Sequence, residues 1–420
     1  MTGAAMHRAF DWQPFVKQHW EKTPARLALP APILPAEQVF QAAISACAPF
    51  RHGTRFRALP DARFFVEAAR LAAPGTLLPG EDDATLAAFS RRASTHLDGA
   101  SFQLHIEQPF MFDFALWSAL RDFLRGLLER VGVPVLPMAT DLLLGRFTRG
   151  PQGIAKRPHH SLVTLVLQGR LRVRLWKKLW GTPPNETEDF DRHLDKATTL
   201  EAGPGEVLYV PSRYWQLEEA QGDCMAVRVW IPVKGSRPTD AVKDVLVGLL
   251  EAQHPHDERV PYHPYPWRRP RKGAQATIPS VEQTADTLHA LTREEDVQQF
   301  LRLIWARRVS ACALEPVPPP APAPNLSDTD RVRRTTPATD IIRMKDPSGL
   351  WIWAVNGHAF PGPNEAGGQR LLDALSSEAP PRVGELCNLA RPGPQREALR
   401  ATLAALVRLR GIHVITGAEV

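Results

Sequence analysis

The stretch GIAKRPHHSLVTLVLQGRLRVRLW, residues 153–176, gathers side chains that can do chemistry. Two adjacent imidazoles, His159 and His160, follow the cations Lys156 and Arg157. Imidazole is a common metal ligand, but this stretch contains no carboxylate to complete a site. The cations would also repel a dication, because like charges about 4 Å apart cost on the order of several kcal/mol, and arginine keeps its proton. The pattern therefore favours an anionic partner: a carboxylate, a phosphate or the acidic part of a peptide.

Short runs of β-forming residues predict the elements that position this stretch. The runs are 141–147, 162–168, 170–176, 205–211 and 223–233. In the third run Leu171, Val173 and Leu175 alternate with Arg170, Arg172 and Arg174, which predicts one inward row and one row of guanidinium groups on the other face. Before these runs, residues 113–131 repeat apolar side chains every three or four positions, which predicts a helix packed on a sheet. The fold class that follows is α+β, with an antiparallel jelly-roll barrel and flanking helices.

Three stretches in the same order within residues 10–235 carry a family resemblance. FVKQHWEKTPARL contains an aromatic helical segment followed by Lys22 and Pro24. Residues 153–176 are similar to a family motif in which Gly-Ile-His-x-Asp is followed by a strand, then by Gly-Arg-x-Arg and a second strand. The third stretch, LEAGPGEVLYVPSRYWQLEEA, is similar to Leu-x-Pro-Gly-Asp-x-Leu-Tyr-x-Pro followed by Trp-His. Together they resemble the JmjC-type cupin oxygenases, especially their bacterial ribosomal-oxygenase branch. The resemblance implies a double-stranded β-helix barrel in which two histidines and one carboxylate hold Fe(II) and leave positions for 2-oxoglutarate and oxygen.

At the matching positions this chain departs from the family. The first histidine falls on Ala155, the carboxylate on Arg157 and the second histidine on Gln216, while the lysine that binds the cosubstrate falls on Leu171. We therefore predict a barrel with no catalytic residues, no metal and no cofactor, in which Arg157 either meets an anionic partner or closes the former iron site by a salt bridge.

An active Fe(II)- and 2-oxoglutarate-dependent protein or peptide hydroxylase is the alternative hypothesis. A shift of the alignment brings His159 or His160 to the first ligand position, but Ser161 or Leu162 then stands where the carboxylate is needed. A more distant group of candidate ligands surrounds His193, but carboxylates clustered around one histidine are more typical of a solvated loop. The group consists of Asp189, Asp191, His193 and Asp195. For the metal-free barrel the expected pocket residues are Lys156, His159, His160, Thr164, Arg172, Arg174, Tyr209 and Trp215.

The domain order expected from composition and from the resemblance has four parts. Residues 1–235 form the barrel with its N-terminal helices, and residues 236–312 form a helical, dimerisation-like segment with helices at 239–252 and 281–308. Residues 313–337 form a proline-rich linker, because EPVPPPAPAPNLS can form neither helix nor central strand. Residues 338–420 form a winged-helix-like domain of two short strands with a turn at Asn356-Gly357, three helices and a last strand. On its first strands Trp351 and Trp353 are candidates for peptide binding, although core packing is the commoner use of such residues.

Charge and composition limit the partners. Lys and Arg exceed Asp and Glu by 51 to 45, and part of the excess lies in the clusters 267–272 and 331–334, which we interpret as solvated basic loops. A nucleic-acid-binding regulator is the second alternative, but the helix over 396–410 is a weak match to a recognition helix, so a protein or peptide partner is expected in preference. The expected assembly is a homodimer or a hetero-oligomer with a peptide- or protein-modifying enzyme, with leader-peptide capture in ribosomal natural-product biosynthesis as one setting.

The expected compartment is the cytoplasm. We find no secretory signal and no segment of about 20 apolar residues, and therefore expect no membrane partner. The four cysteines form no CxxC pair, which favours buried or free thiols over zinc sites or disulfides; they are Cys47, Cys224, Cys312 and Cys387.

Overall fold

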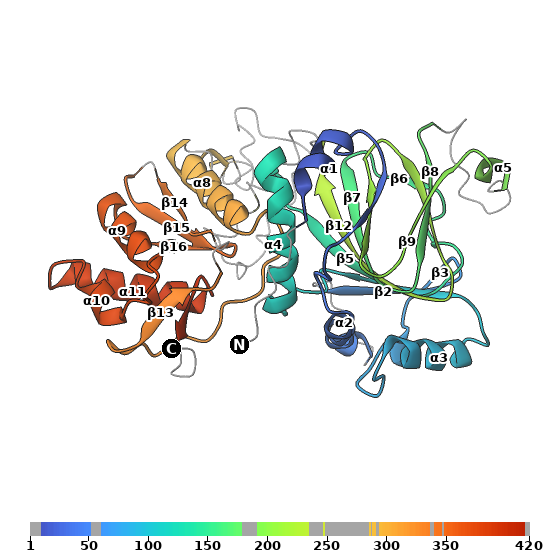
Figure 1. The fold of residues 1–420 in the computed structure, drawn as a ribbon, viewed down its shortest axis with the longest axis horizontal. Helices are drawn as coiled ribbons and strands as arrows, with labels where there is room; N and C mark the ends of the chain where they lie inside the picture. The colour runs from blue at the N-terminus through green and yellow to red at the C-terminus, as the bar shows by residue number, and fades with distance from the viewer. Residues whose placement is uncertain are drawn as a thin grey trace, which may run out of the picture. The chain divides into compact units, whose positions relative to one another are not determined.

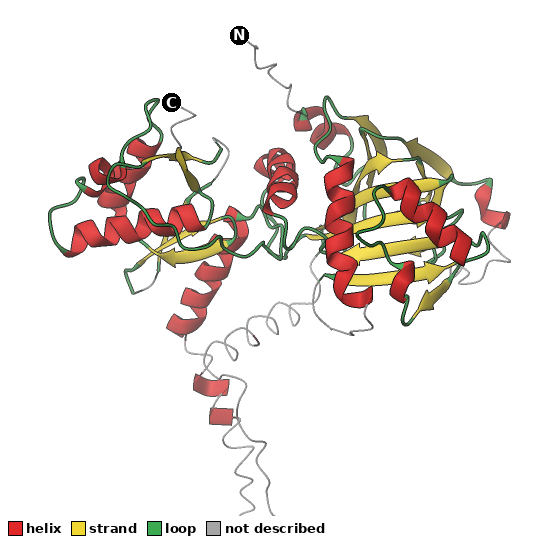
Figure 2. Ribbon diagram, turned by 90° about the horizontal axis from the view of Figure 1, so that it is seen from below, coloured by secondary structure: helices red, strands yellow, loops and turns green. Residues whose placement is uncertain are grey.

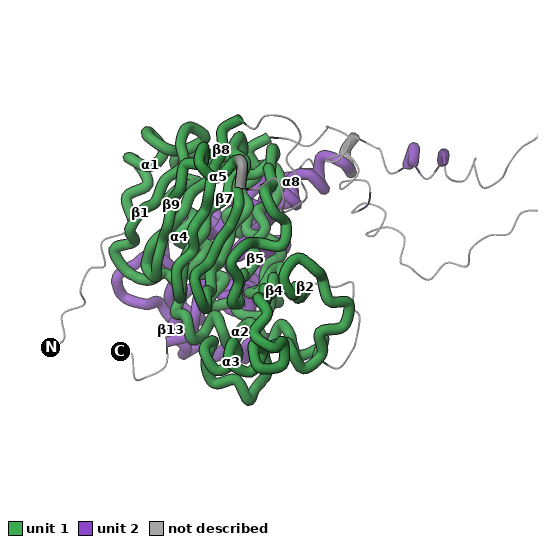
Figure 3. Tube along the Cα trace, turned by 90° about the vertical axis from the view of Figure 1, so that its right-hand side faces the viewer, with its two compact units in different colours: residues 1–235, 311–321 green, residues 236–310, 322–420 purple. Residues whose placement is uncertain are grey.

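The computed structural model describes residues 10–51, 60–178, 191–234, 247, 285–286, 288–290, 294–336, 340–346 and 348–415. The chain divides into two compact units (Figure 3): unit 1 contains residues 1–235 and 311–321, and unit 2 contains residues 236–310 and 322–420. The described part of the chain combines helices with large antiparallel sheets, in agreement with the expected α+β class. Within it, no helix is long and apolar enough to cross a membrane.

Two antiparallel sheets form the body of unit 1 (Figure 1). The first has eight strands in the order β1 (Ala25–Ala28), β10 (Glu206–Val210), β7 (His160–Gln168), β12 (Asp223–Pro232), β5 (Ala139–Arg146), β4 (Phe102–Glu107), β2 (Asp61–Val66) and β3 (Ala69–Leu71). The second has four strands in the order β6 (Ala155–Lys156), β11 (Trp215–Ala220), β8 (Leu171–Trp176) and β9 (Thr198–Ala202). The five strands predicted from the apolar runs are confirmed as β5, β7, β8, β10 and β12. The other seven strands of these sheets were not predicted, although in β4 the apolar residues Phe102, Leu104 and Ile106 alternate with polar ones.

Helices cover the outer face of the large sheet (Figure 2). They are α1 (Trp12–Gln18), α2 (Ala36–Arg51), α3 (Leu86–His96) and α4 (Phe114–Val131), with the 3₁₀ turn η1 (Gly75–Leu77) between strands and helices; α5 (Asp191–Leu194) follows β8 in the chain. The predicted helix at 113–131 is confirmed as α4. Asp113 begins it by accepting a hydrogen bond from the Leu116 amide, and Gly132, at φ 88°, follows its last turn.

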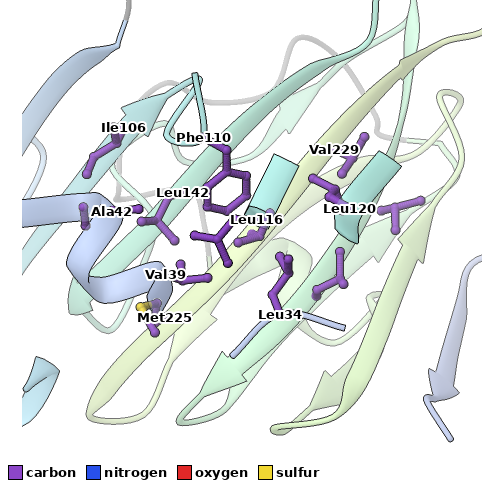
Figure 4. Packing of buried hydrophobic residues seen from close by; sticks show 14 of the residues in the cluster. Leu34, Val39, Ala42, Ile106, Phe110, Leu116, Leu120, Leu142, Met225 and Val229 are labelled. Atoms are coloured by element: carbon purple, nitrogen blue, oxygen red, sulfur yellow. The ribbon is translucent and has the colours of Figure 1, made fainter. Parts of the chain in front are cut away.

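Two hydrophobic cores lie on opposite faces of the large sheet. Helices α2 and α4 pack on the outer face, and Val39, Leu120 and Val229 belong to the core cluster on that face (Figure 4). The inner face shares a second core with the small sheet, which includes Leu143, Val166, Leu171, Val173, Leu175 and Ala226. The predicted alternation in 170–176 is therefore confirmed for its apolar row. The arginines of that run lie on the outer face of the small sheet and pair with carboxylates: Arg170 and Arg172 with Glu201, and Arg174 with Glu219.

Residues 311–321 belong to unit 1, although 313–321 were expected to form part of a linker. Ala311 to Leu314 are almost fully buried, Leu314 forms a β-bridge with Met138, and its carbonyl accepts a hydrogen bond from the Trp117 indole. A proline-rich segment that cannot pair as a strand can still pack, because its apolar side chains are buried and its carbonyls find donors.

The described part of unit 2 contains two small antiparallel sheets, and a helix packs on one of them. Helix α8 (Glu294–Ser310) packs on a three-stranded sheet in the order β14 (Ile342–Lys345), β15 (Trp351–Val355) and β16 (His358–Pro361). A two-stranded sheet joins β13 (Arg331–Arg334) to β17 (Ile412–Ile415), and the helices are α9 (Glu365–Leu375), α10 (Val383–Cys387) and α11 (Pro394–Arg408). The three helices, the last strand and the Asn356-Gly357 turn, with φ of 50° and 79°, are confirmed.

Two interpretations of unit 2 need correction. The basic cluster 331–334 is strand β13 and not a solvated loop, since it pairs along its length with β17 and buries Val332. Strand β14 was not predicted, so the first sheet has three strands where two were expected. Of the helix expected over 239–252 the structure describes only residue 247, which is helical, and of the helix expected over 281–308 it describes mainly α8. The cluster 267–272 lies outside the described residues.

Candidate functional site

One end of the space between the two sheets of unit 1 is polar. Strand β12 carries Arg228 into this space, directly opposite Asp141 on β5, and strand β11 carries Glu218 into it from the small sheet. The side chains of the three residues are 5%, 12% and 10% exposed. The polar end is thus a buried cluster of one guanidinium and two carboxylates, each from a different strand.

Arg228 is held from both sides. Its Nε and Nη2 donate to the two oxygens of Asp141 at 2.6 and 2.9 Å, and its Nη1 donates to Glu218 Oε2 at 2.6 Å. The Trp230 indole donates to Asp141 Oδ2 at 2.9 Å, so this carboxylate is fixed by both neighbours. Such bidentate hydrogen bonds between arginine and a carboxylate are strong and geometrically specific.

The electrostatics of the cluster depend on this pairing. Burial by itself would lower the pKa of Arg228, but Asp141 and Glu218 outweigh it, so the pKa is raised above its ordinary value. Removing one partner from a buried ion pair costs about 3–5 kcal/mol, because the other charge is left without compensation. Arg228 is therefore a fixed cation at the polar end of the barrel.

His105, on β4, borders the cluster as a neutral imidazole. Its Nδ1 lies 3.5 Å from Arg228 Nη2, and its ring is 5.3 Å from that of Phe65. Burial, and secondarily the charge of Arg228, lowers the pKa of His105 to about 3. At neutral pH the residue therefore adds no positive charge to the cluster.

The structure brings two of the three positions aligned with iron ligands to this cluster. Strand β6 pairs with β11 so that Ala155 lies opposite Gln216. Both residues line a cavity of about 20 Å³, together with Glu218 and Arg228. Arg157 does not line this cavity and lies at the wall of a larger neighbouring recess.

These residues do not fit an iron ion. Ala155 offers no ligand atom, Gln216 offers a neutral amide, and Glu218, the carboxylate that lines the cavity, is already paired through Oε2 with the fixed cation Arg228. Across the described ranges, no group of three or more His, Cys, Asp or Glu side chains is arranged to hold a metal ion. A two-histidine, one-carboxylate site therefore has no counterpart at these positions.

The recess beside the small cavity has a volume of about 310 Å³ and a mixed lining. Arg63 is paired with Asp61 and Glu107 on its wall, and Arg228 also lines it. Arg157 instead contacts neutral groups: it donates to the side-chain oxygen of Gln152 and lies over the Trp230 ring at 5.3 Å.

His160 is half-buried in the recess, with a pKa lowered by burial and then by His159 and Arg157. The recess therefore presents one guanidinium held by an amide and an indole, beside an imidazole.

The other predicted pocket residues are distributed over several surfaces. Thr164 is buried opposite Arg228 in the strand register. Tyr209 lies on the other face of the large sheet, where it hydrogen-bonds with Glu21 and where burial raises the pKa of its hydroxyl. Lys156 is exposed over the Trp215 ring at 5.8 Å, and Trp215 packs in a small outer cluster. His159 is exposed.

The histidines proposed as alternative ligands do not converge. His193 lies on α5, where its carbonyl accepts a hydrogen bond from the Trp176 indole in the same outer cluster as Trp215. His159 is on the surface and His160 lines the recess. Asp189 lies outside the described residues, so the acidic group around His193 is only partly described.

Unit 2 has a separate cavity of about 350 Å³ between α8 and the strands β15 and β16. Trp351 lines it with Phe300, Leu303 and Phe360. Trp353 lies on the same face of β15: it is fully buried in a core against which Trp351 also packs, and its indole donates to the Pro363 carbonyl. The structure therefore shows core packing for Trp353, while Trp351 stays a candidate for peptide binding.

Sequence reasoning missed the residues of the polar end: Arg228, Asp141, Glu218 and His105. One signal was present, because Arg228 interrupts the apolar run 223–233 on a strand whose other residues are mostly buried. Its partners could not be inferred, since Asp141 lies 87 residues away and meets it only through the strand register.

Comparison with known proteins finds similarity at the level of structure only. No family model matches the chain, and no curated protein matches it. The structure is similar to that of YcfD from Escherichia coli, described as a ribosomal oxygenase, with 15% identity over 97% of this chain and 98% of that chain and a TM-score of 0.49. A second structure of YcfD, in complex with cobalt and 2-oxoglutarate, gives 17% identity, 97% and 99% coverage and a TM-score of 0.48.

Proposed function

We propose that this chain is a metal-free member of the JmjC/cupin type, a pseudo-oxygenase that binds an acidic side chain of a protein or peptide in the recess of unit 1. The observation that carries the proposal is the position of Arg228, clamped between Asp141 and Glu218 beside Ala155 and Gln216. Arg228 supplies the positive charge beside these two positions, because a guanidinium does not lose its proton.

The proposed function includes a more specific fold for each unit than two packed sheets and a helical part. Unit 1 is taken as a double-stranded β-helix, which the two antiparallel sheets and their shared inner core support. The C-terminal part is taken as a winged helix, supported by three helices beside small antiparallel sheets. Both assignments describe a scaffold, and the function is argued from the residues of the recess.

The chemistry of the ligand follows from Arg157. Arg63 and Arg228 are each held by two carboxylates, whereas Arg157 is held by an amide oxygen and an indole face. A guanidinium presents its donors in a planar fork that matches a carboxylate. A recess of about 310 Å³ accommodates a side chain or a short segment of a peptide.

Binding of defined peptides tests this function. The probes are a blocked peptide of alternating Glu and Gly and the same peptide with Gln in place of Glu, titrated into the full-length protein by calorimetry. We expect the Glu peptide to bind and the Gln peptide to bind at least about tenfold more weakly, because the charge-assisted bonds are lost.

Two variants locate the binding. Arg157→Ala should remove the preference for Glu, and Arg172→Ala, which changes an arginine on the outer face of the small sheet, should leave it unchanged. Equal binding of both peptides, or a preference that survives Arg157→Ala, would refute the proposal.

The wider setting of this proposal is a cytoplasmic complex with a peptide- or protein-modifying enzyme, or a homodimer, and includes leader-peptide capture. Trp351, which lines the unit 2 cavity, is the candidate for a second peptide contact. Co-purification of the tagged full-length chain with an enzyme, compared between wild type and Trp351→Ala, tests this setting; loss of the enzyme only in the variant is the expected result.

A further inference from the structure

The small cavity at the polar end of unit 1 contains three buried polar atoms whose hydrogen bonding is incomplete. They are His105 Nε2, Gln216 Oε1 and Glu218 Oε1, and none of them has a hydrogen-bond partner among the described residues. His105, Gln216 and Glu218 all line the cavity of about 20 Å³. A buried polar atom without a partner costs about 1–3 kcal/mol, so three of them around one cavity require an explanation.

The donors and acceptors around the cavity can be assigned. Arg228 always donates, so His105 Nδ1, 3.5 Å from Arg228 Nη2, faces a donor and must carry the lone pair. The neutral imidazole therefore carries its hydrogen on Nε2. Glu218 uses Oε2 to accept from Arg228, which leaves Oε1 as an acceptor, and Gln216 Oε1 is a second acceptor.

The size and the bonding pattern select the ligand. One donor and two acceptors are satisfied together by a molecule that accepts one hydrogen bond and donates two. A water molecule does this, and a volume of about 20 Å³ corresponds to about one water. A metal cation would face the N–H of His105, and an anion would face two acceptor oxygens.

We infer that this cavity is a specific site for one water molecule, which accepts from His105 and donates to Gln216 and Glu218. The water links the small sheet, through Gln216 and Glu218 on β11, to β4 of the large sheet. His105, Arg228 and Trp230 also line the larger recess, so the water site adjoins that recess. The inference does not depend on what the recess binds.

A crystal structure of the full-length protein at about 1.6 Å resolution, with diffraction also measured at the iron absorption edge, tests the site. We expect one peak without anomalous signal, at about 2.6–3.2 Å from each of the three atoms. An empty cavity, an anomalous peak, or direct contact between the three side chains would overturn the inference.

Two glutamine variants give a matched test in solution. Gln216→Leu removes one acceptor and disrupts the water, so we expect the folding equilibrium constant to fall by about tenfold or more in urea titrations. Gln103→Leu is the control, because Gln103 is also buried with an unpaired amide but does not line the cavity. It should leave the constant unchanged or raise it; a larger loss for Gln103→Leu than for Gln216→Leu would contradict a water held by Gln216.

Discussion

The two ends of the space between the sheets of unit 1 are built from the same strands but follow different physical rules. Strand β12 gives Ala226 to the apolar end and Arg228 to the polar end, while β5 gives Leu143 and Asp141 in the same order. The apolar end is stable in proportion to the area it buries. The polar end is stable only while each charge keeps its partner. Two positions further along the same paired strands, the packed apolar core is thus replaced by a buried cluster of charged side chains.

The largest effect is expected at the polar end. Arg228→Ala leaves Asp141 and Glu218 buried without their cation and should lower the free energy of unfolding by about 3–5 kcal/mol. Urea denaturation followed by tryptophan fluorescence measures this. Arg172→Ala is the control: Arg172 is 30% exposed on the outer face, and the loss of its pair with Glu201 should cost no more than about 1 kcal/mol. Equal losses for the two variants would show that the Arg228 cluster is not special.

At the apolar end a truncation should cost somewhat less and follow a different rule. Leu143→Ala removes a fully buried side chain and should lower the free energy of unfolding by about 3 kcal/mol, through lost transfer energy and the cavity left behind. The same urea experiment at pH 5 and pH 8 should give the same loss, since no titrating group is involved. A loss that changes with pH would mean that the two ends are not independent.

The pH dependence separates the two ends further. The pKa of His105 is about 3 in the folded chain and near 6.5 when unfolded, so between these values the unfolded state binds a proton that the folded state does not. The contribution of His105 is therefore present above pH 6.5 and is lost as the pH falls towards 3. Between pH 7 and pH 4.5 wild type should lose about 2–3 kcal/mol more than His105→Gln does. Parallel curves for the two proteins would contradict a neutral, buried His105.

Sequence patterns predicted the framework better than the site. The five apolar strands, α4 and the three terminal helices follow from hydrophobic period, which is a local property. The site depends on register: Asp141 and Arg228 are neighbours because β5 and β12 pair, and no local pattern records that pairing. The motif alignment did place Ala155 and Gln216 at one location, whereas it gave no indication that Arg228 fills the adjoining space.

Metal content tests the central claim most directly. The full-length protein is purified, incubated anaerobically with Fe(II) and 2-oxoglutarate, desalted, and analysed for iron by mass spectrometry and for succinate release with peptide present. The account predicts far less than one iron per chain and no succinate above the level of a denatured control, for wild type and for Gln216→Ala alike. One iron per chain that is lost on replacing Gln216 or His160 would contradict it.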